Sequence, residues 1–439
     1  MSAAEDLVGL AREILAVALA AAAPHAFTRD AITRSLGPGD DISSRPFWII
    51  AVGKAAHAMA ATAVQELAAR GSRVAGGIIV ATDAAPAPHP AIESLVADHP
   101  IPGERSAHAA GRLGLLCDGV GDGDAILVLI SGGASSLVGA PVDGVPTKDL
   151  ASLHALLLAS GLDIARTNLV RKRFSRWGAG RLAVALTPAL VLPIILSDVP
   201  GDDPAVVASG PCSPDPAMAR DVESVIREAG IASRLPLSLG SYLGAVRSGD
   251  RQETPKPGSP VFALVRTPIV GGNRSALEAA AKRAHDFGVQ RVLVDSRPLH
   301  GDATAVGRAV ARALGGAAPG TVLLYGGETT VTLPAAHGTG GRNQQLALAA
   351  AEVLGDLSAP PAALLAVGTD GRDGPTDAAG AIVTNDTWRA IGAAGVNAAS
   401  ALNRCDSYHA LDAVGALVRT GPTGTNVADI VIAIRAGTA

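Results

Sequence analysis

Short apolar runs alternate along this chain with longer segments in which apolar residues recur every three or four positions. The short runs predict buried strands, and the longer segments predict helices with one buried face. Strands are expected at residues 47–52, 77–80, 93–97, 124–130, 191–196, 262–270, 291–294, 321–325, 329–333, 363–367 and 427–434. Helices are expected at residues 7–18, 55–70, 149–159, 168–185, 276–287, 346–354 and 399–418, with another beginning at Ser106 and another ending at Leu314. This alternation predicts an α/β protein.

One segment divides the pattern. Residues 249–260 are rich in proline, glycine and charge, and the α/β pattern restarts after them. At 439 residues the chain is also longer than one core usually organises. We therefore expect a first domain over 1–248, a linker over 249–260 and a second domain over 261–439, with the functional site between the domains.

Composition and charge exclude some classes of function. Hydrophobic residues make up 48% of the chain and charged residues 17%, which indicates a large core. The formal net charge is -4, so the chain has no basic field to attract nucleic acid. Aromatic residues, on which bases would stack, are only 3%. We expect no nucleic-acid partner.

Cysteine usage and the N-terminal region predict a cytoplasmic protein. The three cysteines (Cys117, Cys212 and Cys405) are far apart in sequence, which excludes a disulfide scaffold and fits a reducing compartment. The apolar run 14–23 is flanked by more acidic than basic residues, unlike a secretory signal. No apolar run reaches membrane-spanning length.

Lys54 follows the expected strand 47–52 and comes just before a helix. An ammonium group and a helix N-terminus both attract phosphate. Only five of the 36 lysine and arginine residues are lysines, which suggests a codon bias toward arginine. Under such a bias, a lysine that arginine could replace would tend to mutate to arginine, so Lys54 is a candidate for a position that needs lysine. The turn is not a Walker A loop, because Trp48 and Ala55 stand where that motif needs glycine and Ser or Thr. A solvated lysine at a helix start is the alternative interpretation.

Two further glycine-rich turns are candidates for phosphate binding, one after an expected strand and one before an expected helix. The strand 124–130 ends in Ser131-Gly132-Gly133-Ala134-Ser135-Ser136, whose amides and hydroxyls are suited to phosphate. A nucleophile elbow is excluded, because Leu137 stands where the motif needs glycine. The turn Gly271-Gly272-Asn273 opens a helix in the second half and is a second candidate for nucleotide phosphate. A plain structural turn is the alternative in each case.

Glycine-rich turns also follow the three strands expected between residues 321 and 367. Together they carry Glu328, Arg342, Asp370, Arg372, Asp373 and Asp377. Ligand-binding edges of open α/β sheets collect such residues at strand ends. We interpret this stretch as a site for an anionic, metal-bound ligand; a tight turn stabilised by Asp370 and Asp373 is the alternative.

Asp198 follows the strand 191–196 and is the candidate for Mg²⁺ in the first half. Mg²⁺ prefers a few carboxylate oxygens together with phosphate and water. Asp202 and Asp203, in the same turn, can instead cap the next helix.

Several blocks resemble one family over nearly the whole chain, in order. They are Val52-Gly-Lys54-Ala, Asp98-His-Pro, Ile130-Ser-Gly-Gly-Ala-Ser135, Leu196-Ser-Asp-Val-Pro-Gly-Asp-Asp203 with Ala208-Ser-Gly-Pro211, Gly271-Gly-Asn273, Gly326-Gly-Glu-Thr329, Gly341-Arg-Asn-Gln344 and Gly368-Thr-Asp-Gly-Arg-Asp-Gly-Pro-Thr-Asp-Ala-Ala-Gly380. This set resembles the glycerate 2-kinase family, whose C-terminal half is called the MOFRL domain.

The resemblance implies an N-terminal Rossmann-like α/β/α sandwich, a smaller C-terminal α/β domain and an active-site cleft between them. It implies phosphorylation of glycerate to 2-phosphoglycerate with ATP and Mg²⁺. Lys54 and Arg342 match the residues held to be catalytic, and which of them meets the phosphoryl group and which the substrate carboxylate stays open. Asp198 would hold Mg²⁺ or orient the attacking hydroxyl. Glu328, Asp370 and Asp373 would contact the substrate. Asp370 is also a candidate metal ligand. The expected partners are glycerate and ATP, and the expected oligomer is a homodimer.

Three other functions remain as alternatives. Arg173, Gly178, Gly103 and Gln345 depart from the family pattern, which leaves a kinase of a related small hydroxy acid open. An NAD(P)H-dependent hydroxypyruvate reductase is a second alternative, although no strand is followed by a complete Gly-x-Gly-x-x-Gly motif. A non-catalytic sensor of sugar acids is the third.

Overall fold

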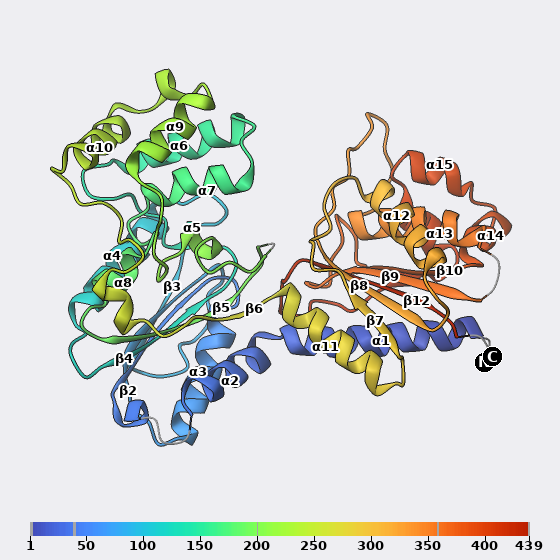
Figure 1. The fold of residues 1–439 in the computed structure, drawn as a ribbon, viewed down its shortest axis with the longest axis horizontal. Helices are drawn as coiled ribbons and strands as arrows, with labels where there is room; N and C mark the ends of the chain where they lie inside the picture. Colours follow the sequence, from blue (N-terminus) through green and yellow to red (C-terminus); the bar gives the residue numbers. More distant parts are fainter. Residues whose placement is uncertain (1–2, 38–40, 200, 358–359, 438–439) are drawn as a thin grey trace. The chain divides into compact units, whose positions relative to one another are not determined.

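The computed structural model describes residues 3–37, 41–199, 201–357 and 360–437. The chain forms two compact units, shown in Figure 1. The first unit is Phe27–Val270, and the second unit combines Met1–Ala26 with Gly271–Ala439. Each unit is built on its own six-stranded sheet, so the predicted α/β class is confirmed.

The sheet of the first unit is parallel, with strand order β3-β2-β1-β4-β5-β6. Its strands are β1 (Phe47–Val52), β2 (Val74–Ala81), β3 (Ile92–Val96), β4 (Ala125–Ile130), β5 (Leu190–Leu196) and β6 (Ile269–Gly271). Its helices are α2 (Pro24–Ser35), α3 (Ala56–Ala69), α4 (Glu104–Asp118), α5 (Ala134–Leu137), α6 (Thr147–Ala159), α7 (Ile164–Arg173), α8 (Arg181–Ala185), α9 (Ala219–Glu228) and α10 (Leu237–Ser248). The central strands are apolar along their whole length because helices cover both faces of a parallel sheet.

The first unit contains a second, purely helical core. Helices α6, α7, α9 and α10 pack on one another through buried leucine, valine, isoleucine and aromatic side chains (Figure 1). In α9, Val222 and Ile226 lie four residues apart and share the buried face of the helix.

The sheet of the second unit is mixed, with order β11-β10-β9-β12-β8-β7. Its strands are β7 (Arg291–Val294), β8 (Thr321–Gly327), β9 (Ala362–Gly368), β10 (Gly380–Thr384), β11 (Leu417–Val418) and β12 (Asp429–Arg435). Its helices are α1 (Ala3–Ala22), α11 (Asn273–Asp286), α12 (Ala303–Gly316), α13 (Arg342–Gly355), α14 (Thr387–Ala393), α15 (Ala398–Asn403) and α16 (Ser407–Asp412). Helices α12 and α13 cover one face of this sheet, whereas α1 and α11 cover the other.

Strand β12 runs antiparallel to both of its neighbours, β8 and β9. Consequently β8 and β9 point in the same direction, and their last residues both pair with Asp429 at the start of β12. The turns after β8 and β9 therefore meet at the same end of the sheet, beyond the carboxyl ends of these two strands, as the sequence predicts.

Two expected strands are wrong. Residues 329–333 form an irregular segment with a single bridge from Thr330 to Asp302, and their apolar side chains line a pocket instead of a sheet. Residues 262–264 belong to a 3₁₀ turn, Val265 makes a single parallel bridge to Val191, and the regular strand β6 forms only at the end of the segment. Pro260 and Pro268 lack the N–H group that a strand must donate to its neighbour.

Two expected helices are each interrupted. The helix expected over 168–185 is broken between Arg173, where α7 ends, and Arg181, where α8 begins. Gly180, just before α8, has φ +79° and lies so close to Pro255 that a side chain would clash. The helix expected over 399–418 divides into α15, α16 and strand β11, with Cys405 at φ 53° between the two helices. Strand β10 and helix α14 correspond to no expected element.

The compact units differ in extent from the expected domains. Helix α1 packs on α11, β9 and β12 and so belongs to the second unit. The segment 249–260 packs within the first unit, where Thr254 is 2% exposed.

Among the described residues no single helix is both long enough and apolar enough to cross a bilayer. Helices α1 and α2, which are bent relative to each other, have the required length and apolar composition only when they are taken together.

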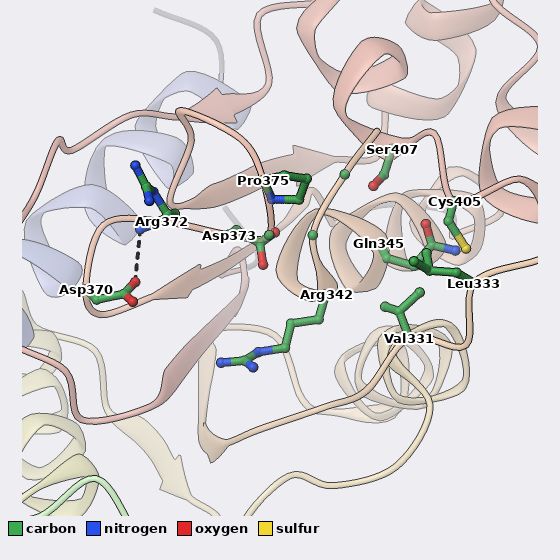
Figure 2. Close-up of a pocket in the computed structure, with 13 residues that line it drawn as sticks. Val331, Leu333, Arg342, Gln345, Asp370, Arg372, Asp373, Pro375, Cys405 and Ser407 are labelled. Atoms are coloured by element: carbon green, nitrogen blue, oxygen red, sulfur yellow. Dashed lines mark hydrogen bonds between the residues drawn. The ribbon is translucent and has the colours of Figure 1, made fainter. Parts of the chain in front are cut away.

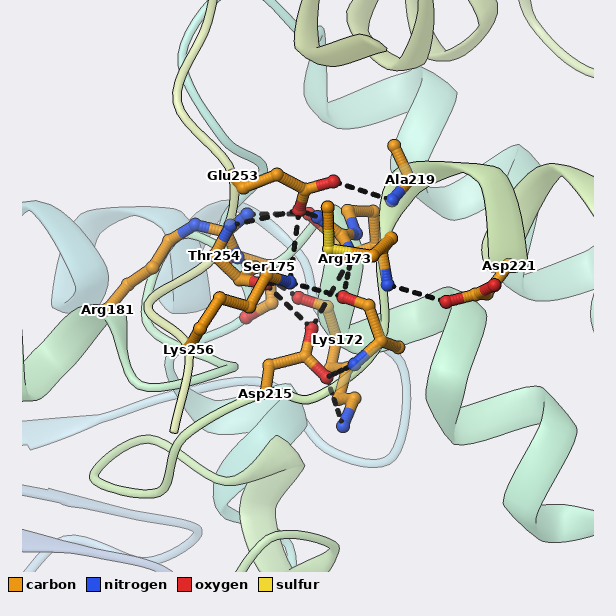
Figure 3. A network of polar contacts seen from close by, with 12 residues as sticks. Lys172, Arg173, Ser175, Arg181, Asp215, Ala219, Asp221, Glu253, Thr254 and Lys256 are labelled. Atoms are coloured by element: carbon orange, nitrogen blue, oxygen red, sulfur yellow. Dashed lines mark hydrogen bonds and ion pairs between the residues drawn. The ribbon is translucent and has the colours of Figure 1, made fainter. Parts of the chain in front are cut away.

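A buried network of charges holds the 249–260 segment in place (Figure 3). Arg173 is fully buried and donates to Glu253 and to the Ala217 carbonyl oxygen. Asp215, also buried, accepts from Lys172 Nζ at 2.8 Å and from Thr254 Oγ1 at 2.9 Å. Burial opposes the charge of Asp215, but its bonds to Lys172 and Thr254 prevail and lower its pKa.

We expect Arg173→Met to destabilise the first unit by about 3–5 kcal/mol, because it removes the fully buried guanidinium group that pairs with Glu253 and leaves only Lys172 and Lys256 beside the two carboxylates. Arg166→Met on the same helix removes the exposed pair with Glu228 and should cost less than about 1 kcal/mol. Urea unfolding of both variants measures the difference. Equal losses of unfolding free energy would contradict a structural role for the buried network.

Candidate active site

The turns after β1 and β4 lie side by side at the carboxyl end of the first sheet. Lys54 N donates to Gly132 O at 2.9 Å, and Ala55 N donates to Ser131 Oγ at 3.0 Å. Gly53 has φ +134°, and a Cβ there would lie 2.1 Å from Ser131 Oγ, so only glycine permits this approach. The fold thus joins the predicted lysine turn to the predicted glycine–serine turn.

Three polar side chains surround Gly132 and Gly133. A Cβ on Gly132 would lie 2.2 Å from Asp198 Oδ2, and a Cβ on Gly133 would lie 2.9 Å from the His99 ring and 3.7 Å from Lys54 Cε. Burial lowers the pKa of His99, the charge of Lys54 lowers it further, and Asp198 opposes both. Lys54, Asp198 and His99 therefore share one electrostatic environment at the strand ends.

His99 is a residue that the sequence did not single out. It precedes a proline in the turn after β3, which is typical of an ordinary loop histidine. Only the parallel order β3-β2-β1-β4 brings that turn to the same edge of the sheet as Lys54.

The predicted phosphate-binding serines differ in their bonding. Ser131 Oγ accepts from Ala55 N, and Ser136 Oγ donates to Gly133 O at 2.9 Å; both residues are buried. Ser135 Oγ shares a 3.0 Å hydrogen bond with Ser209 Oγ and is partly exposed. Ser131 and Ser136 thus shape the turn, and Ser135 is the hydroxyl that solvent reaches.

In the second unit, the turn Gly271–Asn273 holds the start of β12. Asn273 Nδ2 donates to the carbonyl oxygens of Val427 and Asp429, at 2.8 Å each. Gly326 packs so tightly on Asn273 that a Cβ there would overlap its side-chain oxygen. The Asn273 side chain therefore ties α11 to β8 and β12.

Arg342, the first residue of α13, forms the central ion pair of the second unit. Its Nε and Nη2 donate to the two Asp429 carboxylate oxygens at 2.6 and 2.9 Å. Its Nη2 also donates to Glu328 Oε1 at 2.6 Å. Burial disfavours the charge of Arg342, but its bonds to Asp429 outweigh that effect and raise its pKa.

Asp429 is a second residue that the sequence did not identify. It is 3% exposed and stands just before the apolar run 430–434, where a polar residue looks like a strand boundary. Burial raises its pKa, although Arg342 opposes that shift.

Asp373 caps helix α13. It accepts from the backbone amides of Asn343 at 3.1 Å and Gln344 at 2.8 Å, and it is 2% exposed. Burial raises its pKa to about 6 in spite of these bonds, and the charge of Asp429 adds to the rise. Its carboxylate holds the helix start in place, and the sequence had assigned it to substrate.

This burial predicts a pH effect. A folded pKa of about 6 lies above the unfolded value of 3.8, so the folded state binds the proton more tightly. Stability from Asp373 is then fullest below about pH 4 and lost as the pH rises to about 6, by about 3 kcal/mol. We expect this loss, measured by urea unfolding across the range, to be absent in Asp373→Asn.

Asp377→Asn is the matched control in the same turn. Asp377 is exposed, and its bonds to Tyr408 and Arg419 lower its pKa, so any pH effect has the opposite sign. Identical pH profiles for wild type and Asp373→Asn would refute the assignment.

A pocket of about 390 Å³ opens beside the N-terminus of α13 (Figure 2). Its charged lining is Arg342, Asp370, Arg372 and Asp373. Val331, Leu333 and Pro375 supply apolar surface. Asp370 is exposed and accepts from Arg372 N at 3.0 Å, the turn-forming bond that was the alternative for this residue.

Two buried side-chain atoms of the pocket lining have no hydrogen-bond partner among the described residues: Gln345 Oε1 and Ser407 Oγ. Gln345 is 3% exposed, and its amide nitrogen already donates to Thr304 Oγ1 and Leu402 O. Buried polar groups are rarely left unpaired. The pocket therefore offers hydrogen-bonding groups to a ligand that carries hydroxyls.

Two family models match the chain. Residues 10–244 match a "Domain of unknown function (DUF4147)", and residues 321–429 match the "MOFRL family".

Named relatives and solved structures cover most of the chain. A "Putative hydroxypyruvate reductase" of Agrobacterium vitis is 40% identical over 87% of this chain and 85% of its own. The "D-glycerate 2-kinase" of Thermotoga maritima is 36% identical over 88% of this chain and 90% of its own. The crystal structure of the glycerate kinase from Thermotoga maritima superimposes with a TM-score of 0.86 at 34% identity, covering 98% of this chain and all of that one.

Proposed function

Because this chain belongs to the glycerate 2-kinase family, with its DUF4147 and MOFRL domains, we propose that Lys54, Asp198 and Arg342 serve its phosphoryl transfer. The chain is a phosphotransferase that acts on glycerate, and kinase chemistry implies ATP as the phosphoryl donor. The roles of individual residues, the metal and the substrate contacts below are our proposals.

We assign the phosphate groups of ATP to the carboxyl ends of the strands in the first unit's sheet, where the turns after β1 and β4 lie. The observation that carries this proposal is the closeness of Lys54, the Gly132–Gly133 turn and Asp198. Phosphoryl transfer needs positioning and neutralisation of charge more than covalent help from the protein. Lys54 supplies a cation, the glycines let a phosphate approach the backbone, and Ser135 offers a hydroxyl.

The donor set fits Mg²⁺ only when the nucleotide contributes ligands. Among the described residues no group of three His, Cys, Asp or Glu side chains is placed to hold a metal ion. Mg²⁺ typically binds through one or two carboxylates, substrate phosphates and water, and Asp198 is such a carboxylate. We propose that Asp198 holds Mg²⁺, which would offset phosphate charge; Asp370 is the candidate in the second unit.

We assign glycerate to the pocket of the second unit. Arg342 and Arg372 suit a carboxylate, since guanidinium groups pair with carboxylates in two-point geometry. Gln345 Oε1 and Ser407 Oγ, unpartnered among the residues that the structure describes, suit the hydroxyls of glycerate. Asp370 is exposed at the pocket and can accept from a hydroxyl as well.

The rival activity is reduction of hydroxypyruvate, which the names of two relatives from Agrobacterium vitis suggest. The turns after β1 and β4 read Gly-Lys and Ser-Gly-Gly, and neither contains the Gly-x-Gly-x-x-Gly pattern that dinucleotide-binding folds use. This difference favours the kinase.

A paired assay separates the activities. Purified protein is given glycerate, ATP and Mg²⁺ with ADP release measured, and in parallel hydroxypyruvate with NADH or NADPH. We expect ADP and 2-phosphoglycerate to form, and activity to stop when EDTA removes Mg²⁺. Oxidation of NADH or NADPH without ADP release would instead support the reductase, and preference for another short hydroxy acid would overturn the substrate assignment.

A further inference from the structure

Strand β7 is one of the two outer strands of the second unit's sheet, and within the part of the chain that the structure describes it pairs only with β8 (Figure 1). Val294 pairs with Leu324, and Asp295 N donates to Leu324 O at 3.0 Å. In a parallel pair, alternate residues bond to the neighbour. Leu293 and Asp295 therefore bond to β8, whereas the backbone groups of Val292 and Val294 point out from the edge.

This edge concentrates exposed apolar side chains. The large hydrophobic residues exposed among the described residues of the second unit are Phe287, Leu293, Val294 and Leu333. Three of the four lie within 287–294, and Leu293 is 60% exposed. Residues 292–294 contain none of the lysine or proline residues that commonly protect edge strands from pairing.

The sequence of the edge is complementary to itself. It reads Arg291-Val292-Leu293-Val294-Asp295, with apolar residues between a cation and an anion. A second copy, placed antiparallel about a two-fold axis at Leu293, puts each Arg291 opposite the partner's Asp295. It also puts Val292 opposite the partner's Val294, and these are the residues whose backbone groups point outward. Directly opposite residues are the pairs that stabilise an antiparallel ladder.

We propose that β7 is a homodimer interface, in which two copies of this chain join their sheets through antiparallel β7 strands. The two-fold axis makes the contact isologous and closed, so the pairing ends at two copies. In the monomer, Asp295 bonds to Arg297, whose side chain is 87% exposed, so the aspartate can exchange this partner at little cost. The strand is short, and we expect a reversible dimer that dissociates on dilution.

A charge-swap experiment tests this arrangement. Arg291→Asp places two aspartates opposite each other at both ends of the interface, and Asp295→Arg places two arginines there. We expect each variant alone to be monomeric in sedimentation velocity, with a dissociation constant raised at least about tenfold over wild type. An equimolar mixture should form a 1:1 heterodimer, because every facing pair is then of opposite sign.

Leucine variants control for loss of folding. Leu293→Lys places two lysines at the two-fold axis and should produce monomers, whereas Leu158→Lys changes an 85% exposed leucine in the first unit and should leave the dimer intact. Recovery of association on mixing the charge variants excludes misfolding as the cause. A monomeric wild type, dimers that persist in both charge variants, or a mixture that stays monomeric would each overturn the proposal.

Discussion

Lys54→Ala is expected to lower kcat by about 10²- to 10³-fold, the usual loss when one group that stabilises transition-state charge is removed. The Lys54 side chain is exposed and forms no hydrogen bond or ion pair with the described residues, so it does not hold the fold together. Its backbone amide, which the substitution keeps, fixes the turn through Gly132 O. We therefore expect the free energy of unfolding to stay within about 0.5 kcal/mol of wild type.

Two comparisons make the Lys54 measurement decisive. Lys148→Ala removes another exposed lysine of the first unit and should leave kcat unchanged. Lys54→Arg keeps the charge but not the compact ammonium, and the scarcity of lysine in this chain predicts that arginine restores only part of the rate. A kcat for Lys54→Ala within about twofold of the Lys148→Ala value would remove Lys54 from the mechanism.

Arg342→Ala is expected to lower kcat by a similar factor of about 10²–10³ and, unlike Lys54→Ala, to destabilise the second unit. The substitution leaves Asp429 buried without its cation. A broken buried pair costs several kcal/mol, but the Arg342 side chain is 37% exposed, so we expect about 1–3 kcal/mol. Binding of an anion by Arg342 also requires an exchange of partner, and the exposed Glu328 contact is the one that solvent reaches.

The double variant Arg342→Ala/Asp429→Asn separates the two effects. Removal of the orphaned carboxylate should restore most of the unfolding free energy while kcat stays low. Arg389→Ala, which removes an exposed pair with Asp386, should change neither quantity. Recovery of kcat together with stability in the double variant would show that Arg342 supports structure alone.

Lys54 and Arg342 lie in different units of the chain, and their action in one reaction stays a prediction. Comparison of kcat/KM in the single and double alanine variants tests it. Residues that act on one transition state give losses that do not add, whereas independent losses multiply.

The sequence predicted the central strands of both sheets well, because strands covered on both faces are apolar along nearly their whole length. The runs at β1, β4, β5, β8 and β9 all ended within one or two residues of the observed strands. The segment 329–333 misled because β-branched residues beside a pocket alternate as they do on a sheet. The start of α13 at Arg342 was missed because the preceding glycines looked like a continuing loop.

The site was only partly predictable, since sequence patterns report what a residue is and not what lies beside it. Lys54, Asp198 and the glycine turns stand at strand ends, and that position pointed to them together with the scarcity of lysine and the resemblance to the glycerate 2-kinase family. Asp429 and His99 become relevant only through strands distant in sequence, β12 beside β8 and β9, and β3 beside β2. Likewise, the periodicity of α1 predicted a buried face but not that the second unit would cover it.

The placement of α1 in the second unit has a consequence for synthesis on the ribosome. The apolar face of α1 emerges before the first unit, yet its packing partners α11, β9 and β12 are translated only after the whole of Phe27–Val270. At usual translation speeds of about 5–20 residues per second, the helix waits roughly 10 to 50 s for α11 and roughly 20 to 80 s for β12. During that interval the nascent chain exposes Leu15 and Ile14, so this short segment is where a chaperone would be expected to engage.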